Sequence, residues 1–226
     1  MNKTDQKYLQ STFFFDTDSP IVRDFAHANA RGKSDPEKAV SLFCAVRELI
    51  YDPYHIRLIP EEFKASRILM RGQGYCVHKA IVLAAVARAI GIPSRLGLAD
   101  VRNHLSTERL RKILKTDIYV CHGYAELFLN GLWLKVTPTF NMSLCEKFGV
   151  KPLEFDGHSD CLFHEFDSSG NRHMEYIKYR GSFADVPFDL ISSTMQANYP
   201  GAYSTNGSVV EGDFAAEAKK EMHTLE

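Results

Sequence analysis

The chain has 226 residues, 45% of them hydrophobic and 24% charged, which is typical of a globular protein large enough to bury a core. Lys and Arg together number 27 and Asp and Glu 28, so the net charge is −1. Because no overall positive field attracts nucleic acid or an anionic membrane, neither is expected as a partner.

The N-terminal segment and the cysteines predict a cytoplasmic protein. Residues 1–20 lack the continuous apolar run of a secretory signal, and the apolar run AIVLAAVARAIGI is short and contains Arg88. The five cysteines are widely spread and odd in number. This favours free thiols in a reducing compartment over a framework of disulfides.

The first part of the chain predicts helices. Apolar residues recur at near-helical spacing in residues 19–32, and residues 34–52 open with the capping sequence SDPE. The apolar face of this second helix places Cys44 in or near the core. A shorter helix is expected within residues 59–72.

A longer, apolar helix follows the turn GQGYC. It is expected to begin at Cys76, where two glycines break the preceding helix, and to stop near Gly91. Cys76 therefore falls in the first helical turn. Two polar neighbours receive no role: His78 is expected to point away from Cys76, and Lys79 to be solvated.

The second half of the chain predicts an antiparallel sheet. Strand-like segments rich in β-branched and aromatic residues occur at 93–101, 116–129, 132–140 and 173–181, with a short helix at 106–115. Asn130-Gly131 is a strong hairpin signal between two of them. Helices followed by an antiparallel sheet indicate an α+β fold.

One domain is expected to occupy residues 1–200, with its core at about residues 50–141. Residues 201–226 are polar and are expected to form a tail that is poorly packed or docks late in folding.

Cys76 is the candidate nucleophile. A helix N-terminus and a nearby imidazolium both lower a thiol pKa, so Cys76 is expected to be the most reactive of the five cysteines. The unpaired N–H groups of the same helical turn, including that of Cys76, could hold the oxyanion of a tetrahedral intermediate.

His122 is the candidate base, and Thr137 is the candidate that orients it. His122 lies in a predicted strand, and the glycine at 123 leaves room beside the imidazole. Pairing across the Asn130-Gly131 turn brings Thr137 roughly opposite residues 121–123, where a partner of the imidazole is needed.

This set of motifs resembles the transglutaminase-like superfamily. Gly-x-Cys opens a helix, GIPSR follows, then a histidine in a strand, then a hairpin strand reading W…TPT; the likeness runs from about Ile50 to Asn141. The resemblance implies a papain-like α+β fold with a Cys-His-Asp triad. Carried over to this chain, it implies Cys76 as nucleophile and His122 as general base and acid.

The third triad position departs from the family pattern. Where the family has DPT, this chain reads TPT, with Thr137 in the Asp position. Threonine can accept a hydrogen bond from the imidazole, but it carries no charge to stabilise imidazolium, and the loss could approach about 10⁴ in rate. A carboxylate from elsewhere is an alternative, and the candidates are Asp100, Asp117, Asp156 and Asp160.

A rival constellation lies in the sequence GHSDCLFHEF. His158, Cys161 and His164 have ligand-like spacing around Asp160, but a fourth ligand is not obvious. The favoured interpretation is a polar loop and strand near the rim of the cleft. No metal and no cofactor are expected.

Two functions remain open at this stage. The first is a cysteine-dependent acyl-transfer enzyme that forms a thioester at Cys76 on a peptide or other amide-containing substrate, followed by hydrolysis or transfer to an amine. The second is a binding or scaffold module in which Thr137 has replaced the triad Asp and activity is weak or lost. A carboxylate beside His122 would favour the enzyme.

Overall fold

The structure is a computed structural model that describes residues 6–104, 106–163, 174–203 and 210–222. Its α-helices are α1 (Pro20–Asn29), α2 (Asp35–Arg47), α3 (Ala65–Arg71), α4 (Cys76–Ala89), α5 (Glu108–Leu114), α6 (Met142–Phe148), α7 (Phe188–Asn198) and α8 (Phe214–Met222). Its strands are β1 (Ile50–Tyr51), β2 (Gln73–Gly74), β3 (Ser94–Asn103), β4 (Ile118–Leu129), β5 (Leu132–Val136) and β6 (Met174–Phe183). Short 3₁₀ helices occupy Gln6–Tyr8 and Pro60–Phe63.

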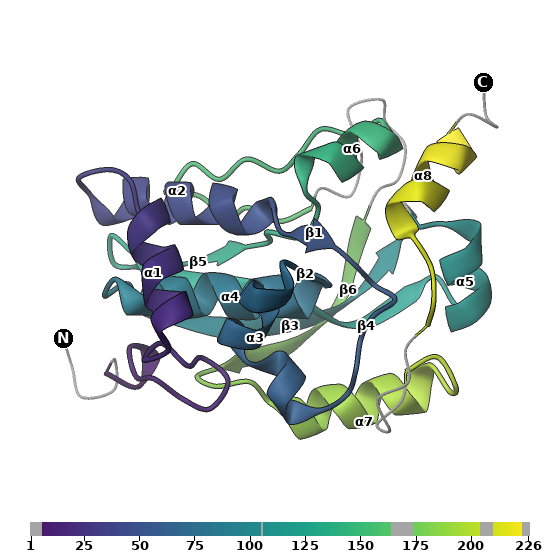
Figure 1. The fold of residues 1–226 in the computed structure, drawn as a ribbon, viewed down its shortest axis with the longest axis horizontal. Helices are drawn as coiled ribbons and strands as arrows, with labels where there is room; N and C mark the ends of the chain where they lie inside the picture. The colour runs from purple at the N-terminus through teal and green to yellow at the C-terminus, as the bar shows by residue number, and fades with distance from the viewer. Residues whose placement is uncertain (1–5, 105, 164–173, 204–209, 223–226) are drawn as a thin grey trace.

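Helix α4 is the centre of the molecule (Figure 1). It packs against β3 and β4 on one side and against α1, α2 and α3 on another. Every residue from Cys76 to Arg88 is buried, and a helix that is buried all round belongs in a core. The predicted α+β arrangement, helices of the first half packed on an antiparallel sheet, is confirmed.

The capping sequence SDPE begins α2 as predicted. The Ser34 hydroxyl accepts a hydrogen bond from the Glu37 N–H, and the Glu37 carboxylate accepts from the Ser34 N–H at 3.0 Å. This reciprocal capping box satisfies two N–H groups that a helix start leaves open.

The main sheet has the strand order β5-β4-β3-β6, and all its neighbours are antiparallel. The hairpin between β4 and β5 turns at Asn130 and Gly131, which have φ values of +50° and +86°, and pairs Leu129 with Leu132. The Asn-Gly signal therefore fixed the turn correctly, because both residues accept the left-handed conformation that a tight hairpin needs.

Two helices of the C-terminal part were not predicted. The sequence patterns missed α6 and α7, and α7 packs against β4. The tail was expected to be poorly packed or to dock late in folding; its helix α8 packs against α6 and buries Phe214 and Ala218.

None of the helices in the described ranges has the length and apolar character needed to span a membrane.

Candidate active site

Cys76 is the first residue of α4, as predicted. Gly72 ends α3 in the left-handed conformation at φ +70°, and the short strand β2 pairs with β1 just before α4 begins. The backbone N–H groups of Cys76 and Val77 lie at the open N-terminus of the helix and act on the sulfur to lower its pKa. The helix start thus aims donors at the thiol.

Gly123 allows strand β4 to pass directly against the start of α4. A Cβ atom at this position would lie 2.6 Å from the Cα of Val77, so a larger residue would push the strand away from the helix. The Gly123 N–H also acts on the Cys76 sulfur and lowers its pKa. Close approach of two backbones, rather than space for an imidazole, is therefore the reason for this glycine.

A β-bulge immediately precedes His122. His122 pairs with Ala99, and the next pair toward the start of β4 joins Tyr119 to Val101, so β4 has an extra residue between the two pairs. Within this bulge, Cys121 takes a left-handed φ of +56°. The Asp100 carboxylate accepts a hydrogen bond from the Cys121 N–H at 3.1 Å and pairs with Arg180 at 2.5 Å. Bulges re-aim side chains, and this one sets the direction of His122.

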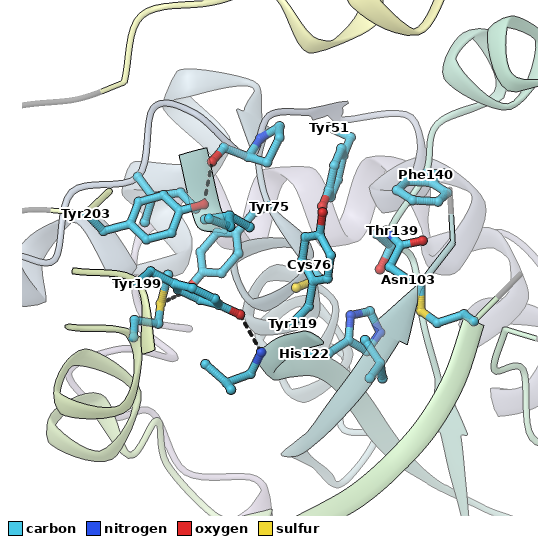
Figure 2. Close-up of a pocket in the computed structure, with 17 residues that line it drawn as sticks. Tyr51, Tyr75, Cys76, Asn103, Tyr119, His122, Thr139, Phe140, Tyr199 and Tyr203 are labelled. Atoms are coloured by element: carbon cyan, nitrogen blue, oxygen red, sulfur yellow. Dashed lines mark hydrogen bonds between the residues drawn. The ribbon is translucent and has the colours of Figure 1, made fainter. Parts of the chain in front are cut away.

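Cys76 and His122 line the same narrow pocket, which Figure 2 shows from close by. Tyr75 and Tyr119 flank it, and most of the remaining lining is aromatic or aliphatic. Cys76 is 8% exposed and His122 is 4% exposed. The structure therefore brings the predicted nucleophile and the predicted base to one enclosed site.

Burial keeps both groups neutral. It raises the pKa of the Cys76 thiol to about 12, although the three backbone N–H groups oppose this change. It lowers the pKa of His122 to about 4, and burial is the sole cause. The expected low thiol pKa is therefore wrong for this state, because desolvation of the thiolate outweighs the helix N-terminus and no imidazolium is present.

Two buried polar atoms at the pocket lack partners. His122 Nε2 and Thr139 Oγ1 have no hydrogen-bond partner among the described residues, and both side chains line the pocket. A buried polar group without a partner costs about 1–3 kcal/mol. Such atoms are common where a ligand or water completes the hydrogen bonding.

Thr137 is buried outside the pocket lining, whereas Thr139 lies within it. The β4–β5 ladder ends at the pair Ala125–Val136. After Val136 the chain leaves this ladder, because the Thr137 N–H donates to the Cys161 carbonyl at 2.9 Å. Neither threonine therefore pairs with His122 in the β4–β5 ladder, and Thr139 is related to His122 by the pocket that both side chains line.

Thr137 instead lies near the hydroxyl of Tyr176. The Thr137 side chain is close enough to lower the pKa of Tyr176, against a larger rise caused by burial, but the two hydroxyls do not form a hydrogen bond of normal geometry. The rings of Tyr176 and Phe163 lie 5.9 Å and 6.1 Å from the His122 ring. Aromatic rings thus adjoin His122 on the side of Thr137.

The four carboxylates considered as replacements have other partners. Asp100 holds the bulge, and Asp117 pairs with Arg102 at 3.0 Å. Asp156 accepts hydrogen bonds from two backbone N–H groups of its own loop, and Asp160 accepts one from the Lys135 N–H. Among the residues that the structure describes, no carboxylate contributes to the lowered pKa of His122.

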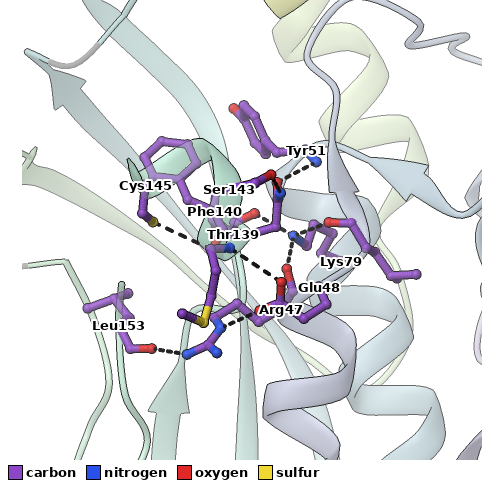
Figure 3. A network of polar contacts seen from close by, with 12 residues as sticks. Arg47, Glu48, Tyr51, Lys79, Thr139, Phe140, Ser143, Cys145 and Leu153 are labelled. Atoms are coloured by element: carbon purple, nitrogen blue, oxygen red, sulfur yellow. Dashed lines mark hydrogen bonds and ion pairs between the residues drawn. The ribbon is translucent and has the colours of Figure 1, made fainter. Parts of the chain in front are cut away.

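Lys79 is not solvated, contrary to expectation. Its side chain is fully buried, and Nζ donates to the carbonyl oxygens of Arg47, Leu49 and Thr139 at 2.8, 2.7 and 2.6 Å (Figure 3). Burial lowers its pKa to about 7. Lys79 thus ties the end of α2 and the pocket residue Thr139 to α4.

Two further cysteine interpretations can be compared with the structure. Cys44 was placed in or near the core, but it is exposed on α2. Cys161 is buried beside β5, and its backbone forms an isolated parallel β-bridge with Val136. His158 is exposed. His164 lies outside the described residues. Within the described ranges, no group of three or more His, Cys, Asp or Glu side chains could hold a metal ion.

Sequence reasoning missed several residues of the pocket. Thr139 follows Thr137 by two positions, so the period of a strand could have named it. Met195, Tyr199 and Tyr203 come from α7 and the turn after it. Nothing in the local pattern connected them with a cysteine more than a hundred positions earlier, because only the tertiary fold brings them there.

Comparison with known proteins gives matches among solved structures and one family. No curated protein matches the chain. A crystal structure from Cytophaga hutchinsonii, described as a "putative cysteine protease", aligns with a TM-score of 0.46 and 15% identity, over 62% of this chain and 43% of that one. The chain thus spans less than half the length of that protein.

The family match covers Cys76 and His122 but not the whole pocket. The sequence profile of the transglutaminase-like superfamily matches residues 23–138, which is half of the chain. The matched region contains Cys76 at the start of α4, His122 on β4 and the end of the β4–β5 hairpin. The chain belongs to the transglutaminase-like superfamily.

Proposed function

We propose that the protein is a cysteine-dependent acyl-transfer enzyme that acts on an amide or ester through a thioester at Cys76. The observation that carries the proposal is the position of Cys76 at the N-terminus of α4, in the pocket that His122 also lines. A packing thiol needs neither feature. A nucleophile needs a base and donors for the charge that develops during attack.

The proposed reaction starts from a neutral pair. As the Cys76 sulfur attacks the carbonyl carbon, His122 takes the thiol proton, so charge appears only during the reaction. Backbone N–H groups at the start of α4 stabilise the oxyanion. The tetrahedral intermediate collapses to a thioester, and His122 returns the proton to the leaving amine or alcohol.

The second half of the reaction repeats these roles. Water or an amine attacks the thioester carbonyl while His122 accepts its proton, and the Cys76 sulfur leaves and is reprotonated. Hydrolysis and amine transfer differ only in the resolving nucleophile. Both belong to the proposal.

A second candidate is a binding module without catalysis. The observation that favours it is the environment of His122: burial lowers its pKa, and no carboxylate of the described residues opposes this change. Imidazolium formed during attack would lack the charge that a triad Asp supplies. This candidate predicts that Cys76 forms no acyl-enzyme at all.

Trapping the acyl-enzyme distinguishes the two candidates. Cys44 is exposed, so the background is Cys44→Ser, which removes an accessible competing thiol. This protein is treated with 4-nitrophenyl acetate, and intact mass with peptide mapping locates the acetyl group. We expect one adduct on Cys76, no adduct at that site in Cys76→Ala, and much slower acylation in His122→Gln.

Circular dichroism of each variant establishes that it is folded. A folded protein without an adduct on Cys76 would overturn the proposal in favour of the binding module. Equal acylation rates with and without His122 would remove the assigned base.

A further inference from the structure

Within the described part of the chain, the residues that line the pocket at Cys76 include no charged side chain. Seventeen residues line it in Figure 2, and none of them is Lys, Arg, Asp or Glu. Five are tyrosines, and most of the others are apolar. A ligand carboxylate or ammonium in this pocket would lose its water without gaining an ion partner, which is strongly unfavourable.

The tyrosines present rings rather than hydroxyls to a ligand, because most of the hydroxyls already bond to the protein. Tyr203 donates to the Pro53 carbonyl at 3.1 Å, Tyr199 donates to the Ile118 carbonyl at 3.0 Å, and Tyr75 donates to the Met195 sulfur at 3.8 Å. Burial raises the pKa of Tyr75 and Tyr203 well above the ordinary value, so these phenols remain neutral.

The polar requirement of a ligand is confined to one end of the pocket. His122 Nε2 and Thr139 Oγ1 lack hydrogen-bond partners within the described part of the chain. They lie in the same pocket as the Cys76 sulfur. A ligand that satisfies the site therefore carries a polar, reactive group at this end and apolar surface elsewhere.

Nearby cations offer no hidden anion site. Lys79 lies one helical turn from Cys76, but its Nζ already donates to three carbonyl oxygens. Arg180 pairs with Asp100 beneath the bulge. Neither cation lines the pocket.

Much of the apolar wall comes from outside the family-matched region. The match ends at residue 138, whereas Met174 belongs to β6, Met195 to α7, and Tyr199 and Tyr203 follow α7. The Tyr203 hydroxyl bonds this segment to Pro53, just after β1. The Tyr199 hydroxyl bonds it to Ile118 and Val120 at the start of β4. The family core thus holds Cys76 and His122, and the C-terminal part encloses them.

We propose that the Cys76 pocket accepts uncharged aromatic or aliphatic acyl groups and excludes charged ones, and that α7 with the turn after it sets this selectivity. The inference rests on the acyl-transfer function proposed above. It adds the chemical class of the acyl group and names Met195, Tyr199 and Tyr203 as the residues that recognise it.

The test compares four esters with the same leaving group in the Cys44→Ser background. They are the 4-nitrophenyl esters of acetate, 3-phenylpropanoate, adipate (anionic) and β-alanine (cationic). Each acylation rate at Cys76 is divided by the rate with a free thiol, which removes intrinsic reactivity. We expect the corrected acylation rate of the 3-phenylpropanoate ester to exceed those of both charged esters by about tenfold or more.

Two variants probe the wall itself. Met195→Ala enlarges the pocket and should raise the relative acylation rate of a bulkier 4-nitrophenyl ester, whose acyl group carries a naphthyl ring in place of the phenyl ring. Leu190→Ala, on the exposed side of α7, should not raise it. Asn103→Asp adds a negative charge to the pocket lining with little change in shape. It should raise the acylation rate of the cationic ester relative to that of the anionic ester.

The outcomes separate the two proposals. Acylation by the acetate ester without preference among the other three, or with preference for a charged one, overturns the selectivity and leaves acyl transfer standing. Acylation by none of the esters overturns the acyl-transfer function, and the selectivity with it. A naphthyl preference that rises equally in Leu190→Ala would show that α7 does not set the selectivity.

Discussion

Cys76 and Lys79 lie three residues apart on α4, are both buried, and differ in how their surroundings treat polar atoms. The Lys79 ammonium has three carbonyl acceptors, so a charge in the core is fully hydrogen-bonded (Figure 3). Around Cys76, His122 Nε2 and Thr139 Oγ1 have no partner among the described residues (Figure 2). The hydrogen bonding around Lys79 is therefore complete, whereas that around Cys76 leaves two buried polar atoms unpaired within the described residues.

Thr139 belongs to both environments. Its carbonyl oxygen accepts from Lys79 at 2.6 Å, and its side chain lines the pocket. The hydrogen bonds of Lys79 thus hold Thr139, a residue of the Cys76 pocket, in place. Burial and a shifted pKa occur in both, so neither by itself identifies a functional site here.

The largest effect should come from breaking the complete network. Lys79→Met keeps most of the side-chain volume but leaves three buried carbonyl groups without their donor. We expect the free energy of unfolding to fall by about 3–5 kcal/mol, measured by urea denaturation. Cys76→Ala is the matched change on the same helix and should cost less than about 1.5 kcal/mol.

Equal losses for the two variants would contradict the comparison. A small loss for Lys79→Met would mean that its three hydrogen bonds contribute little beyond apolar packing.

The next effect is a loss of stability in acid from His122. Because burial lowers its pKa to about 4 from an ordinary 6.5, the unfolded chain binds this proton more readily than the folded protein does. The resulting stability is present above pH 6.5 and is lost as the pH falls to about 4. The difference corresponds to about 3 kcal/mol.

Denaturant titrations between pH 4 and pH 7 measure this loss. His122→Gln should show a shallower decline over the same interval, because glutamine does not titrate. Identical slopes for the two proteins would show that His122 is not held neutral by burial.

Local patterns predicted much of this fold for clear physical reasons. The capping sequence before α2, the glycine turn before Cys76 and the Asn130-Gly131 hairpin are specified by neighbouring residues. The missed helices α6 and α7 follow irregular segments and have no comparable start signal. Their positions depend on packing against α8 and β4.

The sequence predicted that Cys76 and His122 share a site, but it did not predict the electrostatics of that site. Motif order named Cys76 and His122, and the structure places both in one pocket. The direction of the Cys76 pKa could not follow from a helix N-terminus alone, because the opposing desolvation comes from distant parts of the chain. Lys79 was misjudged because its three acceptors come from separate segments.

A smaller effect concerns the order of thiol alkylation. Cys44 is exposed, whereas Cys76 is buried with a pKa raised to about 12. We expect iodoacetamide at pH 7.5 to label Cys44 at least about tenfold faster than Cys76, since only thiolate reacts. Mass spectrometry of a time course gives both rates. Faster labelling of Cys76 would show that the resting site is open and its thiolate stabilised.

The smallest effect distinguishes Thr137 from Thr139 as the partner position of His122. A carboxylate close to the imidazole favours imidazolium and raises the His122 pKa from about 4. We expect Thr139→Asp to raise it more than Thr137→Asp, because the side chain of Thr139 lines the same pocket as His122 and that of Thr137 does not. The buried Lys79 ammonium at the Thr139 carbonyl moderates the rise. NMR titration of the imidazole measures both pKa values, with Thr137→Asn and Thr139→Asn as uncharged controls. A larger rise in Thr137→Asp would assign the partner position to the residue that the family motif names, and the pocket lining would then be a poor guide to the missing carboxylate.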